Sequence, residues 1–357
     1  MGLDLTIAER VARARADLRM GAVVALRGPE GAALIQAAEA VSDARLTDLT
    51  ALGRPQLAIT RWRAETLRAR AYDGDLARIE VRGDAAWVRA VSDPARDLDT
   101  PLKGPFQCLR GGDAALHRAA IRLSKEAQLL PAALVLPIAD APRLAQTHDL
   151  TTLDLKTYGN LPFALTEVAA ARVPLKISAA GRVRVFRPHD GSEEHYAVEV
   201  GPPPRPGPAL VRLHSACFTG DVIGSLKCDC GPQLNTALDQ IGQERAGVLL
   251  YLNQEGRGIG LANKMRAYAL QDQGFDTVEA NHRLGFEDDE RDFRIGAEIL
   301  KALGLTSVRL MTNNPAKVAR MQAHGIEVVE RVPLRAGRTP ENAAYLAVKA
   351  AKSGHLL

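Results

Sequence analysis

Apolar residues in the first half of the chain follow two different periods. Short apolar runs of strand length (AVVAL, QLAIT, ARIEV and AALVLP) alternate with stretches whose apolar residues recur every three or four positions (IAERVARARADL and ALHRAAIRLSKEAQLL). Bounded apolar runs are typical of buried strands, and the longer period is typical of helices that pack on a core. The pattern therefore predicts an α/β domain that ends near residue 172.

The second half begins with strand patterns and then alternates between helices and strands. RVRVFRP, HYAVEVG and ALVRLHSA are typical of strands, and from Asn235 onwards helical and strand patterns follow one another up to IEVVERV. The segment YGNLPFALTEVAAARVP carries no clear long element, so we place a domain boundary within it. We predict two domains of the α/β class (α+β type), residues 1–172 and 173–357.

Length and composition agree with two globular domains. The 357 residues exceed the roughly 250 at which single cores usually stop growing, and 46% are hydrophobic. The net charge of +4 is too low for a nucleic-acid-binding face. The charged N-terminal stretch is unlike a secretion signal, and no apolar run reaches about 18 residues. We therefore expect a cytoplasmic protein that binds neither nucleic acid nor a membrane.

Three of the four cysteines lie close together in HSACFTGDVIGSLKCDCGPQL. Cys217, Cys228 and Cys230 form a C-x10-C-x-C array, whereas Cys108 stands apart and is predicted to be a small core residue. Three protein ligands favour a catalytic zinc ion, which keeps a fourth position for water. Two alternatives stay open: buried inert thiols, or a structural zinc site that uses His214 as its fourth ligand.

A glycine-rich turn follows the strand pattern GVLLYLN and precedes a helical pattern. Backbone amides and the positive end of a helix hold phosphate in this arrangement, and the guanidinium of Arg257 can grip a phosphate with two hydrogen bonds. Glu255 is either a solvated carboxylate or an acceptor for the donor edge of a base. Lys317, in the first turn of the helix predicted after Pro315, also favours an anionic ligand unless it is merely a solvated side chain. The acidic run Glu287 to Glu290 is by itself typical of a solvated helix start.

Residues 173–357 resemble GTP cyclohydrolase II, the zinc enzyme that opens riboflavin biosynthesis. The resemblance is carried by RLHSACFTGDVIGSLKCDCGPQL, YLNQEGRGIGLANKMRAYALQDQGFDTVEANHRLGFEDDERDF, RLMTNNPAKVARM and VERVPL. It implies a mixed-sheet domain and hydrolysis of GTP to formate, pyrophosphate and 2,5-diamino-6-ribosylamino-4(3H)-pyrimidinone 5′-phosphate. It also implies one Zn²⁺ per subunit, Mg²⁺ on the substrate triphosphate and a homodimer.

The same resemblance implies a set of site residues. The zinc ligands are Cys217, Cys228 and Cys230. The residues that contact GTP are Arg212, Leu213, His214, Ser215, Gln233, Glu255, Gly256, Arg257, Thr277, Thr312 and Lys317. Asp289 matches the proton acceptor, Arg291 the nucleophile towards the α-phosphorus, and Tyr268 a hydrogen-bond donor or acid. Because a guanidinium stays protonated at neutral pH, stabilisation of the phosphoryl transition state is the more ordinary role for Arg291.

Two positions depart from the family pattern. Ala216 stands where the family has a carboxylate beside the first zinc ligand, and Asn253 stands where a basic residue commonly precedes QEGR. These changes leave open a related enzyme that acts on another purine nucleotide or stops at a formamide product. A non-catalytic GTP-binding module is the alternative from another class.

The N-terminal half resembles 3,4-dihydroxy-2-butanone 4-phosphate synthase. The resemblance is carried by AERVARARADLRMGAVVAL and HRAAIRLSKEAQLLPAALVL. That synthase needs an acidic loop to hold Mg²⁺ and move protons, but LRGPEGAALI keeps only Glu30 and Gly31 of it. His117 matches a metal-binding histidine, whereas Ala119 replaces the glutamate that normally follows it. We therefore expect a degenerate, inactive domain.

Overall fold

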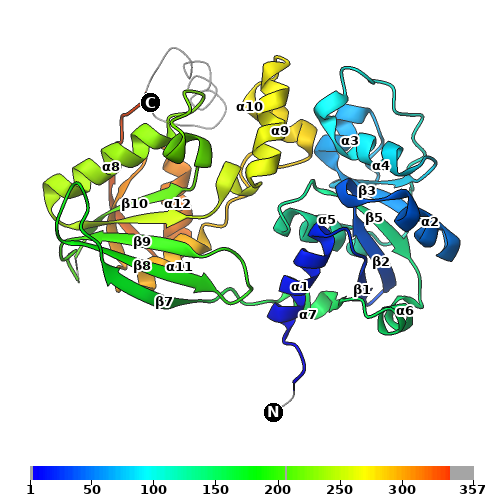
Figure 1. Ribbon diagram of the computed structural model, residues 1–357, viewed down its shortest axis with the longest axis horizontal. Coiled ribbons are helices and arrows are strands. Elements are labelled where there is room, and N and C mark those ends of the chain that lie inside the picture. The colour runs from blue at the N-terminus through cyan, green and yellow to red at the C-terminus, as the bar shows by residue number, and fades with distance from the viewer. Residues whose placement is uncertain (1–2, 206, 338–357) are drawn as a thin grey trace. The chain divides into compact units, whose positions relative to one another are not determined.

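The computed structural model describes residues 3–205 and 207–337 (Figure 1). Its contacts divide the chain into two compact units. Unit 1 comprises Met1–Pro162 and Ile259–Glu290, and unit 2 comprises Phe163–Gly258 and Arg291–Leu357. The expected two-part α/β organisation is confirmed, but the units do not coincide with the predicted ranges 1–172 and 173–357, of which the last twenty residues lie outside the described part.

Unit 1 contains a mixed sheet with helices on both faces. Among the described residues its strands are ordered β4-β3-β5-β2-β1-β6, with β6 parallel to β1 and the other neighbours antiparallel. The strands are β1 (Val24–Gly28), β2 (Gly31–Ala37), β3 (Gln56–Thr60), β4 (Leu76–Glu80), β5 (Ala132–Pro137) and β6 (Thr152–Asp154). The helices before residue 163 are α1 (Ile7–Arg19), η1 (Ala38–Ala40), α2 (Asp43–Leu52), α3 (Arg61–Leu67), α4 (Ala85–Ser92), η2 (Pro94–Arg96), α5 (Ala115–Glu126), α6 (Ala141–Thr147) and α7 (Leu155–Gly159).

Alternation along the strands gives unit 1 two apolar layers. On β5, Leu134 and Leu136 pack with residues of α2, α3, α4 and α6, whereas Ala133 and Val135 pack with α1, α5 and α7. Successive side chains of a strand point to opposite faces, so a strand buried on both sides has an apolar residue at nearly every position. This explains the uninterrupted run AALVLP.

The segment Ile259–Glu290 completes unit 1 although it lies far along the chain. It carries α9 (Leu261–Asp272) and α10 (Thr277–Leu284), whose apolar residues form a small core with Leu130. Thr60 donates a hydrogen bond of 2.8 Å to the Gly285 carbonyl, and the Trp62 ring stacks on His282 with centroids 3.8 Å apart. These contacts, distant in sequence, explain why the periodicity gave no sign of the division.

Unit 2 is built on a sheet that is half parallel and half antiparallel. Among the described residues its strand order is β13-β12-β10-β11-β9-β8-β7, parallel from β13 to β11 and antiparallel from β11 to β7. The strands are β7 (Leu165–Arg172), β8 (Gly181–Pro188), β9 (His195–Val200), β10 (Ala209–Ser215), β11 (Gly247–Leu252), β12 (Ser307–Met311) and β13 (Glu327–Val332). The helices are η3 (Phe218–Val222), α8 (Cys230–Glu244), η4 (Glu255–Gly258), α11 (Arg294–Ala302) and α12 (Pro315–Ala323).

The strand β7 lies in the segment where no element was expected. It is the edge strand of the sheet, and seven of its eight residues are exposed. An edge strand exposed on both faces has no apolar alternation, so its sequence gives no strand signal. Its pairing with β8 places Leu165–Arg172 in unit 2 and moves the boundary upstream of the predicted one.

The two faces of the unit 2 sheet are covered by different helices. Val211 and Leu213 of β10 pack with α11 and α12, whereas Leu210 packs with α8 (Figure 1). Arg212 and His214 share the parity of Leu210 and therefore lie on the α8 face of the strand. None of the helices in the described residues is both long and apolar enough to span a membrane.

Asp97 provides a test of the unit 1 core. It accepts hydrogen bonds from Arg63, which is 1% exposed, and from Lys103. Burial alone would raise the pKa of Asp97, but the two cations hold it below the usual 3.8. Asp97→Ala leaves a buried guanidinium without its carboxylate, so we expect a loss of about 3–5 kcal/mol in the free energy of unfolding.

Urea unfolding followed by tryptophan fluorescence measures this loss, because both tryptophans, Trp62 and Trp87, lie in unit 1. Asp99→Ala, which removes an exposed partner of Arg96, is the control and should cost at most about 1 kcal/mol. The contribution of Asp97 is present above pH 3.8 and is lost as the pH falls through its lower folded pKa. Equal stability of the two variants at pH 7 would contradict the assignment.

Candidate functional site

Three thiols converge at the end of β10. Cys217 follows this strand, Cys228 lies in the loop after η3, and Cys230 begins α8. Their sulfur atoms lie within 4.8 Å of one another, and the Cys217 and Cys228 sulfurs are 3.7 Å apart. Tetrahedral zinc with bonds of about 2.3 Å would place two sulfurs about 3.8 Å apart, so the group fits such an ion.

Two glycines make room for the sulfur atoms. A Cβ atom on Gly220 would lie 2.8 Å from the Cys228 sulfur and 3.2 Å from the Cys217 sulfur. A Cβ atom on Gly231 would lie 2.2 Å from the Gly220 carbonyl oxygen. The backbone at Gly220 also donates a hydrogen bond of 3.3 Å to the Cys217 sulfur. The cradle therefore depends on glycine at both positions.

Two of the three thiols, Cys228 and Cys230, have raised pKa values in the absence of a cation. The hydrogen bond with Cys217 raises the pKa of Cys228, and hydrogen bonds with Cys217 and Cys228 raise the pKa of Cys230 well above its usual value. Thiolates crowded at this distance repel one another, whereas a divalent cation displaces the protons and stabilises the thiolates. The donor set is therefore suited to a metal rather than to free, reactive thiolates.

His214 does not join the sulfur group. Its Nε2 atom lies 3.0 Å from a carboxylate oxygen of Asp221, and within the described residues only the three cysteines form a potential metal-ligating group. The same carboxylate accepts hydrogen bonds from the Tyr251 hydroxyl and the Cys217 amide, both at 3.0 Å. The alternative of His214 as a fourth zinc ligand thus disagrees with the structure. Sequence reasoning missed Asp221 because a lone aspartate in a polar loop looks solvated.

Buried cations surround the carboxyl ends of β10 and β12. Arg212 donates to the Met311 carbonyl at 2.9 Å and to Gln233 Oε1 at 2.7 Å, and burial lowers its pKa to about 10. Lys317 is 7% exposed and donates to the Leu213 carbonyl at 3.1 Å. Lys317 is therefore not the solvated surface lysine that its sequence context allowed.

Other predicted residues of unit 2 lie at the same strand ends. Arg291 donates to the Ser215 hydroxyl at 3.3 Å. Thr312 follows β12, is buried, and its hydroxyl accepts a hydrogen bond of 3.0 Å from the Asn314 amide. Because parallel strands end at the same edge of a sheet, residues after β10, β11 and β12 meet there.

The turn after β11 has a strained backbone. Gly256 and Arg257 both have φ of 63°, a left-handed conformation that is costly for a residue with a side chain. The Glu255 carboxylate accepts hydrogen bonds from the Phe218 amide at 2.6 Å and the Gly256 amide at 3.0 Å. Glu255 thus ties this turn to the segment after Cys217 and is not merely a solvated carboxylate.

Three of the predicted residues belong to unit 1. Tyr268 lies on α9, with the Lys264 ammonium 5.7 Å from its ring centre, and Thr277 is the first residue of α10. Asp289 lies in the loop after α10, within the acidic run. Neighbours in this run are paired, since Glu287 accepts from Trp62 and Glu290 accepts from Lys125. The run is therefore more than a solvated helix start.

The two departures from the family pattern have different structural consequences. The Ala216 amide continues the sheet by donating to the Leu252 carbonyl at 2.8 Å, while its methyl group supplies no polar contact. The Asn253 side chain donates to the Glu194 carbonyl, and its amide donates to His195 Nδ1 at 3.0 Å. Asn253 therefore anchors β11 to β9.

In unit 1, the remnants of the acidic loop belong to no potential metal-ligating group among the described residues. Glu30 is exposed in the turn between β1 and β2. His117 is 2% exposed, its Nε2 atom lies 2.8 Å from Gln56 Oε1, and burial lowers its pKa to about 4. The histidine is thus held neutral inside the unit.

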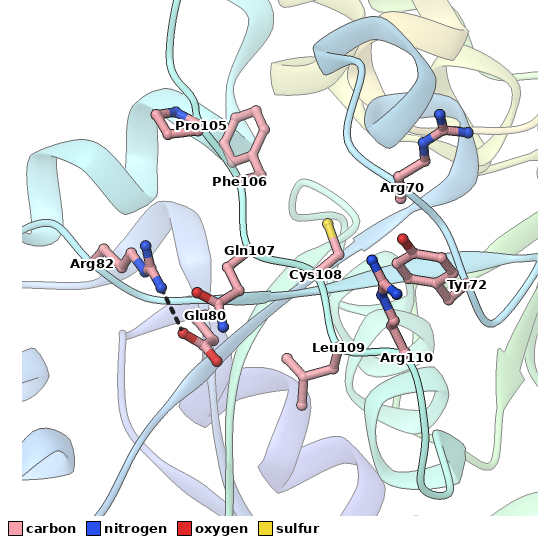
Figure 2. Close-up of a pocket in the computed structure, with 10 residues that line it drawn as sticks. All are labelled: Arg70, Tyr72, Glu80, Arg82, Pro105, Phe106, Gln107, Cys108, Leu109 and Arg110. Carbon is pink, nitrogen blue, oxygen red and sulfur yellow. Dashed lines mark hydrogen bonds and ion pairs between the residues drawn. The ribbon is translucent and has the colours of Figure 1, made fainter.

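Cys108 lines a separate cavity of about 660 Å³ in unit 1 (Figure 2). It is half-buried, packs at the margin of the core and pairs with Ile79 across an isolated bridge. Burial raises the pKa of its thiol. The Arg110 guanidinium lies 5.2 Å from the centre of the Tyr72 ring on the same wall. The expectation of a small core residue holds in part, because one side of Cys108 faces this cavity.

Gly220→Ala tests the sulfur cradle. The added methyl group collides with Cys228 and Cys230, so we expect about 10- to 100-fold weaker zinc binding, measured by competition with a chromogenic chelator. Gly159→Ala is the matched control, because no atom lies within 4 Å of its added Cβ. Unchanged zinc affinity in Gly220→Ala would show that the sulfurs do not need this cradle.

Comparisons with known proteins identify the family. Residues 166–333 match the family model of GTP cyclohydrolase II. The chain is 42% identical to GTP cyclohydrolase-2 of Azospirillum brasilense over 99% of this chain and 95% of that protein. It is 60% identical to the riboflavin biosynthesis protein RibBA of Bacillus cereus over 46% of this chain and 42% of that protein. A crystal structure of RibBX, a two-domain 3,4-dihydroxy-2-butanone 4-phosphate synthase from A. baumannii, aligns with 90% of this chain and 99% of its own, at 18% identity and a TM-score of 0.32. Because the similarity to the Azospirillum protein spans nearly the whole of both chains, this chain belongs to the GTP cyclohydrolase II family.

Proposed function

We propose that this protein hydrolyses GTP to 2,5-diamino-6-ribosylamino-4(3H)-pyrimidinone 5′-phosphate, formate and pyrophosphate, the first step of riboflavin biosynthesis. The observation that carries the proposal is the convergence of three cysteine sulfurs beside buried cationic side chains at one sheet edge. Full-length similarity to a GTP cyclohydrolase-2 supports it.

The cysteine group is the proposed zinc site. Cys217, Cys228 and Cys230 would hold the ion and leave one position for water. When bound, zinc supplies an activated water for attack on C8 of the purine. Two features of the protein shape this site. Gly220 has no side chain that would collide with the cysteines, and the Asp221 carboxylate accepts a hydrogen bond from the Cys217 amide.

Arg212 and Lys317 are the proposed anchors for the triphosphate. Both are largely buried, and Arg212 remains protonated at neutral pH because its lowered pKa is still about 10. A buried cation gains more from an anion than an exposed one does, because little water screens the pair. Mg²⁺ on the triphosphate is part of the proposal for pyrophosphate release.

Glu255 and Gln233 are proposed to contact the nucleotide, with the Gly256 and Arg257 turn presenting backbone amides. Arg291 is proposed to stabilise charge on the phosphoryl group, since a guanidinium is a poor nucleophile. Tyr268 and Asp289 are proposed to handle protons during ring opening, and Thr277 and Thr312 to contact GTP. The assembly is proposed to be a cytoplasmic homodimer.

Unit 1 is proposed to lack synthase activity. His117 is buried, neutral and hydrogen-bonded to Gln56, and Ala119 replaces the expected glutamate. A metal-binding site for a sugar phosphate needs several carboxylates that face the substrate, and the β1–β2 turn supplies Glu30 alone from the former motif.

Incubation of zinc-loaded protein with GTP and Mg²⁺ tests the activity. Formate, pyrophosphate and the pyrimidine are followed separately by mass spectrometry and absorbance, and we expect all three. Pyrophosphate without formate would show that Ala216 or another change has altered ring opening. Binding of GTP with no product would favour a non-catalytic module.

Cys228→Ser should lose zinc and turnover together, because a serine hydroxyl is a poor zinc ligand at neutral pH. Cys108→Ser is the matched control, since Cys108 lies outside the sulfur group. Zinc content by mass spectrometry and formate release are measured on both variants. Full activity in a zinc-free Cys228→Ser protein would refute the metal assignment.

The full chain should not convert ribulose 5-phosphate to 3,4-dihydroxy-2-butanone 4-phosphate. Steady formation of that product with Mg²⁺ present, detected by mass spectrometry, would overturn the inactive assignment of unit 1. The control is the same preparation turning over GTP, which establishes that the protein is folded.

A further inference from the structure

Asp221 gathers three hydrogen-bond donors on one buried carboxylate. Its side chain is 3% exposed. The Cys217 amide and the Tyr251 hydroxyl each lie 3.0 Å from one carboxylate oxygen, and His214 Nε2 lies 3.0 and 3.1 Å from the two oxygens. The donors come from β10, from β11 and from the residue that begins the sulfur group.

The carboxylate determines which nitrogen of His214 carries the proton. A carboxylate only accepts hydrogen bonds, so Nε2 must be the donor. Burial lowers the pKa of His214, which favours the neutral ring. In a neutral ring with a protonated Nε2, the other nitrogen carries a lone pair.

The second nitrogen of His214 is therefore a buried acceptor. Nδ1 has no hydrogen-bond partner among the described residues, and the ring is 3% exposed. A buried polar atom without a partner costs free energy comparable to a lost hydrogen bond. Such an atom needs an explanation, and a bound ligand that supplies the missing donor is one that places the cost at a functional site.

We propose that Asp221 is a positioning residue that holds His214 in the tautomer with a protonated Nε2, so that Nδ1 accepts a hydrogen bond from an N–H or O–H donor of the bound nucleotide. Asp221 simultaneously fixes the backbone of Cys217. This inference rests on the proposed function, since it assigns the ligand of Nδ1 to the nucleotide.

A variant of Tyr251 distinguishes the effect of the His214 tautomer from the effect of packing around Asp221. Its hydroxyl donates to Asp221, and its ring stacks beside His214 with centroids 5.6 Å apart. Tyr251→Phe removes one donor but leaves the ring and the contact between Asp221 and His214. It is therefore the matched control for loss of the carboxylate.

The first measurement is the tautomer itself in the unaltered full chain. Histidine is labelled with ¹⁵N, and the two ring nitrogens of His214 are distinguished in a long-range ¹H–¹⁵N spectrum, with His214→Gln giving the assignment. We expect a protonated Nε2 without nucleotide, and a shift of the Nδ1 signal when GTP is added to zinc-free protein. A protonated Nδ1, or an Nδ1 signal indifferent to GTP, would overturn the proposal.

The second measurement is Asp221→Asn. The amide has the same shape, but its NH₂ group replaces one of the two oxygens near Nε2, so a protonated Nε2 loses one acceptor and faces a donor, which favours the other tautomer. We expect zinc content near that of the unaltered chain, a changed His214 tautomer, and a fall in kcat of about 10²-fold or more. Tyr251→Phe should keep the tautomer and most of kcat.

Two results of the variant experiment would contradict the proposal. Unchanged kcat with an altered tautomer would show that turnover does not depend on the tautomer. A loss of kcat in proportion to the loss of zinc would show that Asp221 only supports the backbone of Cys217. If the unaltered chain released no formate from GTP, the proposed function would fail, whereas the Nδ1 response to GTP would still decide the role of Asp221.

Discussion

The close approach of two backbone segments is the constraint on which the site depends. Gly220 and Gly231 leave no room for a Cβ atom, and their close approach lets a loop and the first turn of α8 present three sulfurs to one point. Asp221, next to Gly220, then secures the loop to β10 and β11 through a single carboxylate. The cysteine group and the packing of the sheet are thereby connected through a few neighbouring residues.

Strand alternation decides which residues of β10 serve the core and which serve the site. Val211 and Leu213 face α11 and α12, whereas Arg212 and His214 face the side of α8. A shift of one residue in the register of β10 would place both polar side chains in the apolar core and the leucine and valine at the site. The parallel pairing of β10 with β11 and β12 fixes that register.

The sequence predicts local features well and long-range ones poorly. The cysteine spacing, the glycine turn and the α/β class follow from short segments, and the structure places the sulfurs together. The strand β7 was not predicted because exposed edge residues leave no apolar pattern. The membership of Ile259–Glu290 in unit 1 was not predicted because it depends on long-range contacts such as that of Thr60 with Gly285. The role of Asp221 was not predicted because its three hydrogen-bond donors come from positions up to thirty residues away.

Two buried polar groups on β10 lower the stability of the folded protein. Arg212 donates to two neutral oxygens, and its Nε has no partner among the described residues. Burial disfavours the charged form of Arg212, and the charge of nearby Asp229 offsets this only in part, so the folded protein carries a cost at this position. The orphan Nδ1 of His214, two residues along the same face of β10, carries a cost of the same kind. An anionic ligand with hydrogen-bond donors, as proposed here for the nucleotide, would satisfy both groups at once and offset the cost of two polar residues on a strand that apolar residues could have stabilised.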